Sequence, residues 1–240
     1  MQAIIMAGGK GTRLRPYTNI LPKPLLPIGN KSILDINIKQ LVSSGVDNLI
    51  IAVGYLGEII ETIIGNGDKY GIKINYSYED QPLGTVGGLA LMKNLLEDQF
   101  IVMNGDILHN LDFDILFKNH IYSKRHVTIT TYTQHHTVRL GVLEIQNKDI
   151  IKYIEKPTND YIVSMGIYVL NKYIIEIFVK EKNYLDFPTL INTLIQNQKK
   201  INSYMHEGLW IDIGTTEEYL NLIENLDEII KENPLIPISI

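Results

Sequence analysis

Near its N-terminus the chain carries the stretch Ala3-Ile4-Ile5-Met6-Ala7-Gly8-Gly9-Lys10-Gly11-Thr12-Arg13-Leu14-Arg15-Pro16. The apolar first part predicts a strand over residues 3–6, and the glycines predict a sharp turn whose backbone can approach a ligand closely. Successive free N–H groups in such a turn form a concave anion site. The dinucleotide motif read from Gly9 would need glycine where Leu14 stands, and a P-loop would need Ser or Thr after Lys10. The stretch therefore predicts a phosphate-binding loop of another kind.

Residues 1–34 contain basic side chains but no Asp or Glu, although the whole chain has a net charge of −5. The basic residues are Lys10, Arg13, Arg15, Lys23 and Lys31. Because arginine can bind two phosphate oxygens at once, Arg13 together with Lys23 could neutralise a polyphosphate. The acidic total argues against general nucleic-acid binding. We therefore expect a small anionic ligand and no nucleic-acid partner.

Short apolar strand patterns alternate with helical periodicity along the first part of the chain. Strands are expected at 3–6, 49–53, 72–78 and 100–103, and helices at 32–44, 58–64 and 85–96. This order predicts an α/β protein with a Rossmann-like three-layer fold, a mostly parallel mixed sheet, and ligands at the carboxyl ends of the strands.

After Asp106 the pattern predicts further strands and helices and an inserted substrate-binding portion. The expected elements are helices at 113–123 and 188–197, strands at 127–133, 140–145, 161–170 and 201–206, and a last helix that a capping box of Thr215 and Glu218 begins. We interpret residues 1–240 as a single domain.

The chain contains no cysteine, which excludes a disulfide framework, a thiolate metal site and a cysteine nucleophile. Its N-terminal apolar run lacks a basic region and is too short for a signal peptide or a membrane span. We therefore expect a cytoplasmic protein without a membrane partner. The apolar segment 234–238 is a candidate contact with a partner subunit.

Five segments resemble, in order, the motifs of the nucleoside-triphosphate transferase family of sugar-1-phosphate nucleotidyltransferases. They are Gly8-Gly9-Lys10-Gly11-Thr12-Arg13-Leu14-Arg15-Pro16, Pro22-Lys23-Pro24, Asn104-Gly105-Asp106, Glu155-Lys156-Pro157 and Trp210-Ile211-Asp212-Ile213-Gly214. The resemblance spans residues 1 to about 223. It implies an Mg²⁺-dependent enzyme that condenses a nucleoside triphosphate with a sugar 1-phosphate and releases pyrophosphate. It also implies that residues 1–110 bind mainly the nucleotide and residues 111–225 mainly the sugar phosphate.

The resemblance gives each matching residue a role. Asp106 and Asp212 would bind Mg²⁺, Arg13 would orient the triphosphate, and Lys23 would bind phosphate at the reacting centre. The implied nucleotide-binding positions are Ala7, Gly8, Gly9, Gly11, Thr12, Glu79, Gly84, Thr85 and Gly105. The implied sugar-phosphate positions are Gly141, Glu155, Lys156 and Gly166, with Lys156 on the phosphate. Each aspartate could instead cap a turn, Asp106 the next one and Asp212 the helix after Thr215.

Glu79 bears on the choice of nucleobase, because its segment lies beside the base in the family. An ionised carboxylate only accepts hydrogen bonds, and guanine offers adjacent N1–H and N2–H donors. Uracil and thymine offer one N–H between two carbonyls. Our hypothesis is GTP, with UTP, dTTP and CTP as alternatives. The segment 79–85 also resembles mannose- and heptose-1-phosphate guanylyltransferases more than thymidylyltransferases. Glu79 as a solvated loop acid is the competing interpretation.

The sugar pocket departs from the family pattern. Many members carry Tyr-Gly-Val and Asn-Ala-Gly where this chain has Leu140-Gly141-Val142 and Ser164-Met165-Gly166. Met165 is expected to narrow or reshape the pocket wall. A mannose- or heptose-type sugar 1-phosphate is the expected partner substrate, and an unusual hexose or a non-sugar phosphate stays open.

Two further expectations concern assembly and activity. We expect a homo-oligomer, with a dimer as the candidate state. A non-catalytic homologue that binds a nucleotide sugar as a regulatory subunit is an alternative from another class. That alternative predicts damaged catalytic motifs, yet Arg13, Lys23, Asp106 and Asp212 are all present. The C-terminal hexapeptide-repeat domain of bifunctional family members is not expected, nor is acetyltransferase activity.

Overall fold

The computed structural model describes residues 1–233, so the apolar segment 234–238 lies outside the described residues. A seven-stranded sheet forms the middle layer, in the order β12-β8-β11-β6-β1-β4-β5. Its strands are β1 (Gln2–Ala7), β4 (Asn48–Val53), β5 (Lys73–Tyr78), β6 (Gln99–Asn104), β8 (Val127–Thr137), β11 (Thr158–Asn171) and β12 (Asn202–Met205). Strands β6, β1, β4 and β5 are parallel, β12 is parallel to β8, and β11 is antiparallel to both of its neighbours. The predicted mostly parallel mixed sheet is confirmed.

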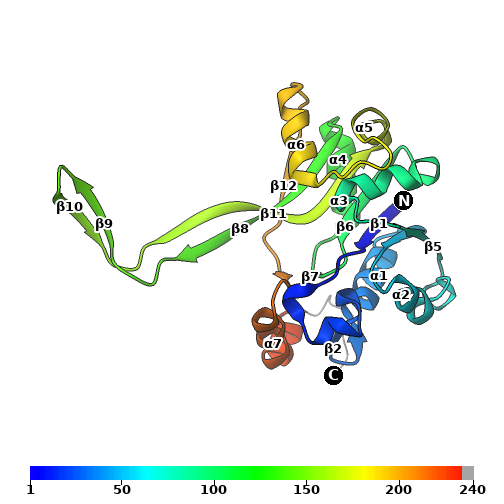
Figure 1. The fold of residues 1–240 in the computed structure, drawn as a ribbon, viewed down its shortest axis with the longest axis horizontal. Helices are drawn as coiled ribbons and strands as arrows, with labels where there is room; N and C mark the ends of the chain where they lie inside the picture. The colour runs from blue at the N-terminus through cyan, green and yellow to red at the C-terminus, as the bar shows by residue number, and fades with distance from the viewer. Residues whose placement is uncertain (234–240) are drawn as a thin grey trace.

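Helices cover both faces of the sheet (Figure 1). They are α1 (Ile33–Ser43), α2 (Gly57–Ile64), α3 (Gly84–Gly87), α4 (Phe113–Ser123), α5 (Lys172–Phe178), α6 (Phe187–Gln196), α7 (Thr216–Glu224) and α8 (Leu226–Glu232). One buried cluster joins α1, α2 and α4 to the sheet, and a second joins α3, α5 and α6 to it. Within β1, Ala3 and Ile5 belong to the first cluster and Ile4 to the second. Because successive side chains of a strand point to opposite faces, an unbroken apolar run identifies a strand buried on both sides.

A third cluster lies at one end of the sheet and supports the N-terminal loop. Leu14 from the loop packs there with Ile213 and with Leu222 of α7. Thr215 is the N-cap of α7, and its Oγ1 accepts a hydrogen bond from Glu218 N–H at 3.2 Å. The cluster therefore fixes residues 12–14 beside the segment that follows Asp212.

The segment expected as one helix over 85–96 is different in the structure. It begins as the short α3 and continues as a 3₁₀ helix, η5 (Gly88–Leu95). The N–H groups of Val86 and Gly87 both donate to Leu185 O at 3.0 Å, so the backbone is anchored to another segment. Three glycines within 84–88 also weaken a regular α-helix.

Within residues 1–233, every helix is too short or too polar to cross a bilayer.

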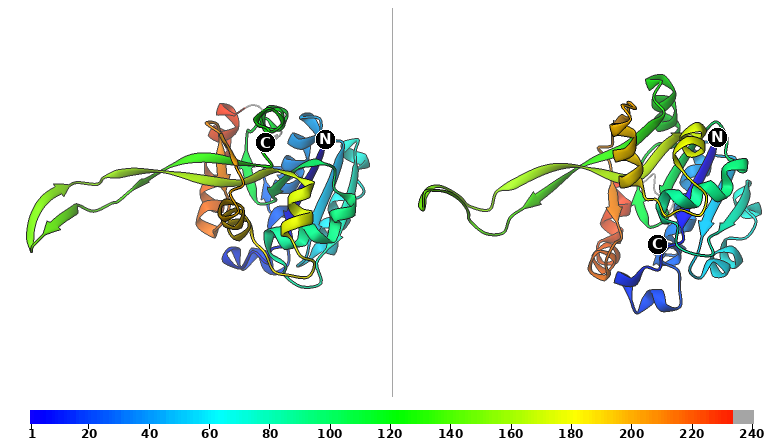
Figure 2. Two further views of the ribbon diagram at one scale, coloured as in Figure 1. Left: turned by 90° about the horizontal axis from the view of Figure 1, so that it is seen from above. Right: turned by 45° about the horizontal axis from the view of Figure 1, so that its top comes forward.

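Residues 134–163, hereafter the arm, leave the body of the molecule as a long two-stranded extension (Figures 1 and 2). The outer parts of β8 and β11 pair as far as Thr137 and Thr158. At the tip, β9 (Val142–Gln146) and β10 (Asp149–Ile154) form a separate hairpin. The strand β10 was not expected from the sequence. In all three views the arm points away from the helices and from the rest of the sheet.

Candidate active site

The glycine-rich loop follows β1 and turns into the short 3₁₀ helix η1 (Thr12–Leu14). Gly11 has φ 57°, the left-handed region, and a Cβ there would lie 2.9 Å from Thr18 Cγ2. Thr18 Oγ1 donates a hydrogen bond to Gly11 O at 2.7 Å, which holds the turn closed. A Cβ on Gly9 would have no atom within 4 Å, so the backbone of Gly9 is open to an incoming group. Local sterics therefore require glycine at position 11, and position 9 is accessible.

A cavity of about 200 Å³ lies beside this loop. Its lining residues come from the loop and from the carboxyl ends of two strands: Met6, Ala7, Gly9, Gly11, Thr12, Arg13, Lys23, Pro24, Asp106 and Gly214. A second cavity of about 350 Å³ shares Met6, Gly9 and Asp106 with it. The second is also lined by Gly8, Glu79, Pro82, Gly84, Thr85, Asn104 and Tyr184. The shared residues make the two cavities neighbours, at the sheet edge where open α/β sheets place their ligands.

Asp106 and Asp212 are brought together by two short strands that the sequence did not predict. Strand β7 (Ile107–His109) pairs antiparallel with β13 (Trp210–Asp212), and the register sets Asp212 opposite Ile107. Ile213 N–H also donates to Asp106 O at 3.3 Å. Gly105, before Asp106, donates its N–H to Met6 O at 3.0 Å and ties this turn to β1. Asp106 and Asp212, about a hundred residues apart in the sequence, are therefore neighbours along the backbone.

The negative charges of Asp106 and Asp212 favour the binding of a cation. Partial burial raises the pKa of Asp212, the nearby Asp106 carboxylate raises it further, and Lys23 and Arg13 oppose the change. Lys23 is buried and its Nζ forms an ion pair with Asp106 Oδ2. The Arg13 guanidinium lies beside the segment after Asp212, since a Cβ on Gly214 would be 3.6 Å from its Nη1. Arg13, Lys23 and Asp106 thus line one cavity, and the segment after Asp212 reaches it at Gly214, whereas Asp212 itself lines neither cavity.

This donor set fits Mg²⁺. Magnesium takes hard oxygen ligands and is usually held by one or two carboxylates together with substrate phosphates and water. Asp106 and Asp212 supply two carboxylates, and desolvation first and the Asp106 charge second raise the pKa of Asp212. Within residues 1–233, no group of three or more His, Cys, Asp or Glu side chains could hold a metal without help from a ligand.

Glu79 faces the second cavity, although part of its carboxylate is already engaged. Its Oε2 accepts a hydrogen bond from Leu83 N–H at 3.1 Å, and burial raises the pKa of the carboxyl group. A Cβ on Gly88 would lie 2.1 Å from the other oxygen, Oε1, so glycine is needed behind it. Glu79 therefore holds its own loop in shape and keeps further acceptor capacity toward the cavity.

Gly84 and Thr85 border the same cavity and also anchor its far wall. Gly84 has φ 78°, and a Cβ there would lie 2.5 Å from Leu185 O. Thr85 Oγ1 accepts a hydrogen bond from Phe187 N–H at 3.1 Å. These contacts place the exposed Tyr184 on the cavity wall. Tyr184 was not singled out in the sequence, since it lies in an irregular segment about a hundred residues from Gly84.

The residues expected around the sugar phosphate divide into two groups. Gly166, with φ 76°, lies behind Asn104, a lining residue of the second cavity, and a Cβ on Gly166 would be 2.5 Å from Asn104 Nδ2. Gly141, Glu155 and Lys156 lie on the arm and line neither cavity. There they are neighbours, because the Tyr153 hydroxyl packs on Gly141 and donates to Glu155 Oε2 at 2.8 Å. The structure therefore gathers most of the residues expected around the nucleotide at the two cavities and leaves Gly141, Glu155 and Lys156 outside them.

Met165 does not shape a pocket wall, contrary to expectation. Its side chain is 1% exposed and belongs to the core cluster beneath the sheet. Its carbonyl accepts a hydrogen bond from Trp210 Nε1 at 3.2 Å. A large apolar residue at this position fills the core, because the strand directs its side chain away from the cavity.

Comparison with known proteins assigns the chain to a family. The family model described as Nucleotidyl transferase matches residues 2–229. A mannose-1-phosphate guanyltransferase of Yarrowia lipolytica is 31% identical over 251 residues, covering 100% of this chain and 68% of that protein. The D-glycero-alpha-D-manno-heptose 1-phosphate guanylyltransferase of Aneurinibacillus thermoaerophilus is 34% identical over 227 residues, covering 91% of this chain and 95% of that protein.

Solved structures agree with the fold. HddC from Yersinia pseudotuberculosis, complexed with GMP-PN, superposes with a TM-score of 0.74 at 26% identity, covering 94% of this chain and 99% of that one. A putative glucose-1-phosphate thymidylyltransferase from Bacillus anthracis superposes with a TM-score of 0.75 at 23% identity over 100% of this chain and 97% of that one, and shows the fold alone. The chain therefore belongs to the nucleotidyl transferase family, among the sugar-1-phosphate nucleotidyltransferases.

Proposed function

We propose that the chain transfers a guanylyl group from GTP to a sugar 1-phosphate of the mannose or heptose type, with Mg²⁺, and releases pyrophosphate. The observation that carries the proposal is the convergence of Arg13, Lys23, Asp106 and the Asp212 segment on one cavity beside the glycine loop. That arrangement offers both the positive charge for a triphosphate and the carboxylates for its metal ion.

The chemistry needs positioning rather than a base. A phosphate monoester has a second pKa of about 6, so its attacking oxygen is already ionised at neutral pH. That oxygen would form a bond to the α-phosphorus of GTP while the bond to pyrophosphate breaks in line. Magnesium, when bound by Asp106 and Asp212, supplies positive charge that offsets the repulsion between the two phosphate groups.

The chain's own residues would bind the phosphates and stabilise the charge that develops during transfer. The backbone of Gly9 and Gly11 cradles the phosphates, and Arg13 stabilises charge at the transferring group. Lys23 is paired with Asp106 in the ligand-free molecule. With Asp106 serving as a metal ligand, Lys23 would be free to bind a phosphate oxygen. Ala7 and Thr12 line the same cavity, and Gly105 holds the turn before Asp106 against β1 through its hydrogen bond to Met6 O.

The choice of GTP rests on Glu79 and on the relatives. Glu79 lines the second cavity, which adjoins the phosphate loop, and its carboxylate can only accept hydrogen bonds when ionised. Guanine presents two adjacent N–H donors, which match such an acceptor. The two curated relatives described above are both named as guanylyl- or guanyltransferases.

The proposal is tested by measuring pyrophosphate release with four triphosphates against a set of sugar 1-phosphates. We expect turnover with GTP and a mannose- or heptose-type phosphate, and none when EDTA removes Mg²⁺. Faster turnover with a pyrimidine triphosphate would reject GTP. No turnover with any pair would reject the enzyme in favour of a regulatory nucleotide-sugar-binding homologue.

Glu79→Gln tests the base contact within the same assay. Glutamine keeps the carbonyl that accepts from Leu83 N–H but loses the charge and replaces one acceptor by a donor. The preference for GTP over UTP in kcat/KM should fall about 10- to 100-fold, which corresponds to about 1.5–3 kcal/mol for hydrogen bonds to a charged group. The neighbouring, exposed Asp80→Asn is the matched control and should leave the preference unchanged.

A further inference from the structure

The tip of the arm has one apolar face and one polar face. The cross-strand pairs Leu143–Tyr153 and Ile145–Ile150 place their side chains together, while the neighbouring pair Glu144–Lys152 lies on the opposite face and forms an ion pair at 3.0 Å. Eight large apolar side chains of the arm are between 42% and 74% exposed: Leu140, Leu143, Ile145, Ile150, Ile151, Tyr153, Tyr161 and Ile162. An isolated two-stranded hairpin is marginally stable in water, so this apolar face needs a covering surface.

The arm cannot reach its own active site while its strands stay paired. The ladder between β8 and β11 continues from the central sheet to Thr137 and Thr158. Lys156 lies beyond that end, and residues 156–164 at about 3.3 Å per residue put it roughly 26 Å from the sheet edge. Figures 1 and 2 show the tip far from the body in every view.

The arm nevertheless starts at the active site. Strand β11 is antiparallel to β6, so residues before Gly166 leave the sheet at the carboxyl end of β6, where Asn104 and Asp106 lie. The root of the arm is therefore next to the cavity, and its tip, with Glu155 and Lys156, points outward.

The two cavities lack a cationic side chain for a second phosphate, and the arm carries one in Lys156. Among residues 1–233, the cationic side chains that line the two cavities are Arg13 and Lys23, and Lys23 is already paired with Asp106. The second phosphate of the proposed reaction has no cation of its own there. The loop beside the first cavity also exposes Tyr17 and Ile20, and Tyr184 is exposed on the wall of the second. Exposed apolar side chains that could dock the arm therefore lie around the same two cavities that lack a cation for the second phosphate.

We propose that two copies of this chain exchange arms, so that Glu155 and Lys156 of one copy complete the sugar-phosphate side of the other copy's active site. A twofold axis satisfies both copies at once, because each gives an arm and receives one. The exchange covers the apolar face of each tip without breaking the β8–β11 ladder. What Lys156 binds rests on the proposed function, whereas the docking of the arm does not.

Cross-linking tests the exchange without any activity measurement. The chain has no cysteine, so single thiols can be introduced cleanly. Lys10→Cys marks the exposed rim of the glycine loop and Lys156→Cys marks the arm. When the two single variants are co-expressed, a short bismaleimide should give a covalent dimer. Lys10→Cys co-expressed with Lys200→Cys, an exposed position between α6 and β12, is the control and should give none. In the double variant Lys10→Cys/Lys156→Cys, an internally cross-linked monomer as the sole product would overturn the proposal.

Complementation tests the catalytic consequence. Asp106→Asn removes the metal site and Lys156→Ala removes the arm's cation, so each variant alone should be nearly inactive. In a co-expressed mixture half of the dimers are mixed, and each mixed dimer has one intact composite site, which restores about a quarter of wild-type activity. Lys152→Ala, on the polar face of the same tip, is the control and should keep full activity.

The outcomes separate the two proposals. A mixture no more active than the single variants, or a fully active Lys156→Ala, would overturn the proposal that exchanged arms complete the active sites, while leaving the enzyme assignment intact. An inactive wild-type chain that still gives the intermolecular cross-link would instead reject the proposed function and keep the exchange.

Discussion

Asp106 and Asp212 lie close together for a reason that is not structural stability. Two neighbouring carboxylates repel, and in this chain partial burial and Asp106 both raise the pKa of Asp212. A raised carboxyl pKa means that ionised Asp212 is less favourable in the folded protein than in the unfolded chain at neutral pH. The fold therefore carries a destabilising feature at its candidate active site, as expected of a group kept for binding.

Asp212→Asn should separate stability from function. The amide removes the unfavourable charge, so the melting temperature of the ligand-free protein in EDTA should rise. Pyrophosphate release should fall by more than about 100-fold, because even outer-shell partners of metal ligands cost about 10- to 100-fold when replaced. Calorimetry and the release assay measure the two quantities on one sample.

Glu217→Gln is the control for this pair of measurements. It is an exposed acid in the first turn of α7 and lines neither cavity. It should change neither the melting temperature nor the activity appreciably. An Asp212→Asn protein that melts lower and stays active would mean that Asp212 only caps α7.

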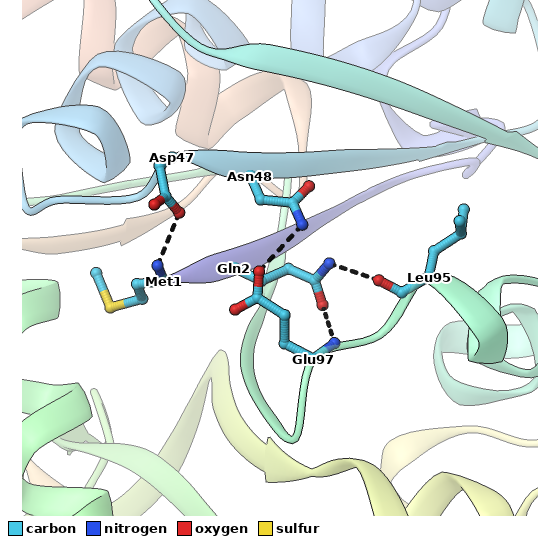
Figure 3. A network of polar contacts seen from close by, with 6 residues as sticks. All are labelled: Met1, Gln2, Asp47, Asn48, Leu95 and Glu97. Carbon is cyan, nitrogen blue, oxygen red and sulfur yellow. Dashed lines mark hydrogen bonds and ion pairs between the residues drawn. The ribbon is translucent and has the colours of Figure 1, made fainter.

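At the scale of elements, one buried glutamine joins the start of β1 to the entry of β6 (Figure 3). Gln2 is fully buried, its Nε2 donates to Leu95 O at 2.8 Å, and its Oε1 accepts from Glu97 N–H at 2.8 Å. Leu95 is the last residue of η5 and Glu97 lies in the connection to β6, where no ladder satisfies these backbone groups. The side chain therefore takes the place of backbone pairing at this edge.

Gln2→Leu should lower the free energy of unfolding by about 2 kcal/mol or more, since each buried group left unsatisfied costs about 1–3 kcal/mol. Urea titration measures the change. Asp47→Ala is the control in the same network: it removes the 2.7 Å ion pair with the N-terminus, but Asp47 is 77% exposed, so the loss should stay below about 1 kcal/mol. Equal losses from the two variants would show that burial of Gln2 is irrelevant.

The sequence predicted the elements whose causes are local. The strand before the glycine loop and the helix over 113–123 follow from apolar runs and periodicity within their own residues, and both occur as expected. Strands β7 and β13 were not predicted, because three-residue strands have too little pattern and their partner lies about a hundred residues away. The 3₁₀ segment Gly88–Leu95 was missed because Leu185, far along the chain, anchors its start.

The same division applies to the candidate site. Arg13, Lys23, Asp106 and Gly11 were found through motifs in single segments, and the structure gathers them around one cavity. Tyr184 gave no signal, since an irregular segment has no period to read. The direction of the arm could not be foreseen either. Alternating residues predict strands, but they do not determine whether a hairpin folds back or extends.

At the scale of the whole molecule, buried histidines govern the response to acid. Burial lowers the pKa of His109 to about 3, with His206 adding to the effect. Burial also lowers the pKa of His120 and of His206. In the unfolded chain these rings titrate near about 6.5. Between that pH and about 3, the His109 ring is therefore protonated in the unfolded chain and neutral in the folded protein.

The sign of the pH effect follows from this difference. Stability rises with pH wherever the unfolded state binds more protons, so the free energy of unfolding should fall as the pH drops below about 6.5, by up to about 1.4 kcal/mol per pH unit for one such group. His109→Asn should reduce this slope, because asparagine does not titrate. Its Oδ1 can still accept from Leu111 N–H, as His109 Nδ1 does at 3.2 Å.

Urea titrations at pH 7 and at pH 4.5 measure this slope for the wild type and two variants. His109→Asn leaves space beside Phe113, against whose ring His109 packs, so its stability at pH 7 should be lower than that of the wild type. Its loss between the two pH values should nevertheless be smaller. His136→Asn, at an exposed position of the arm, is the control and should lose as much stability as the wild type. If His109→Asn kept the full wild-type slope, the acid sensitivity would have to come from carboxylates that are ion-paired in the folded state, and the neutral, buried ring of His109 would have no part in it.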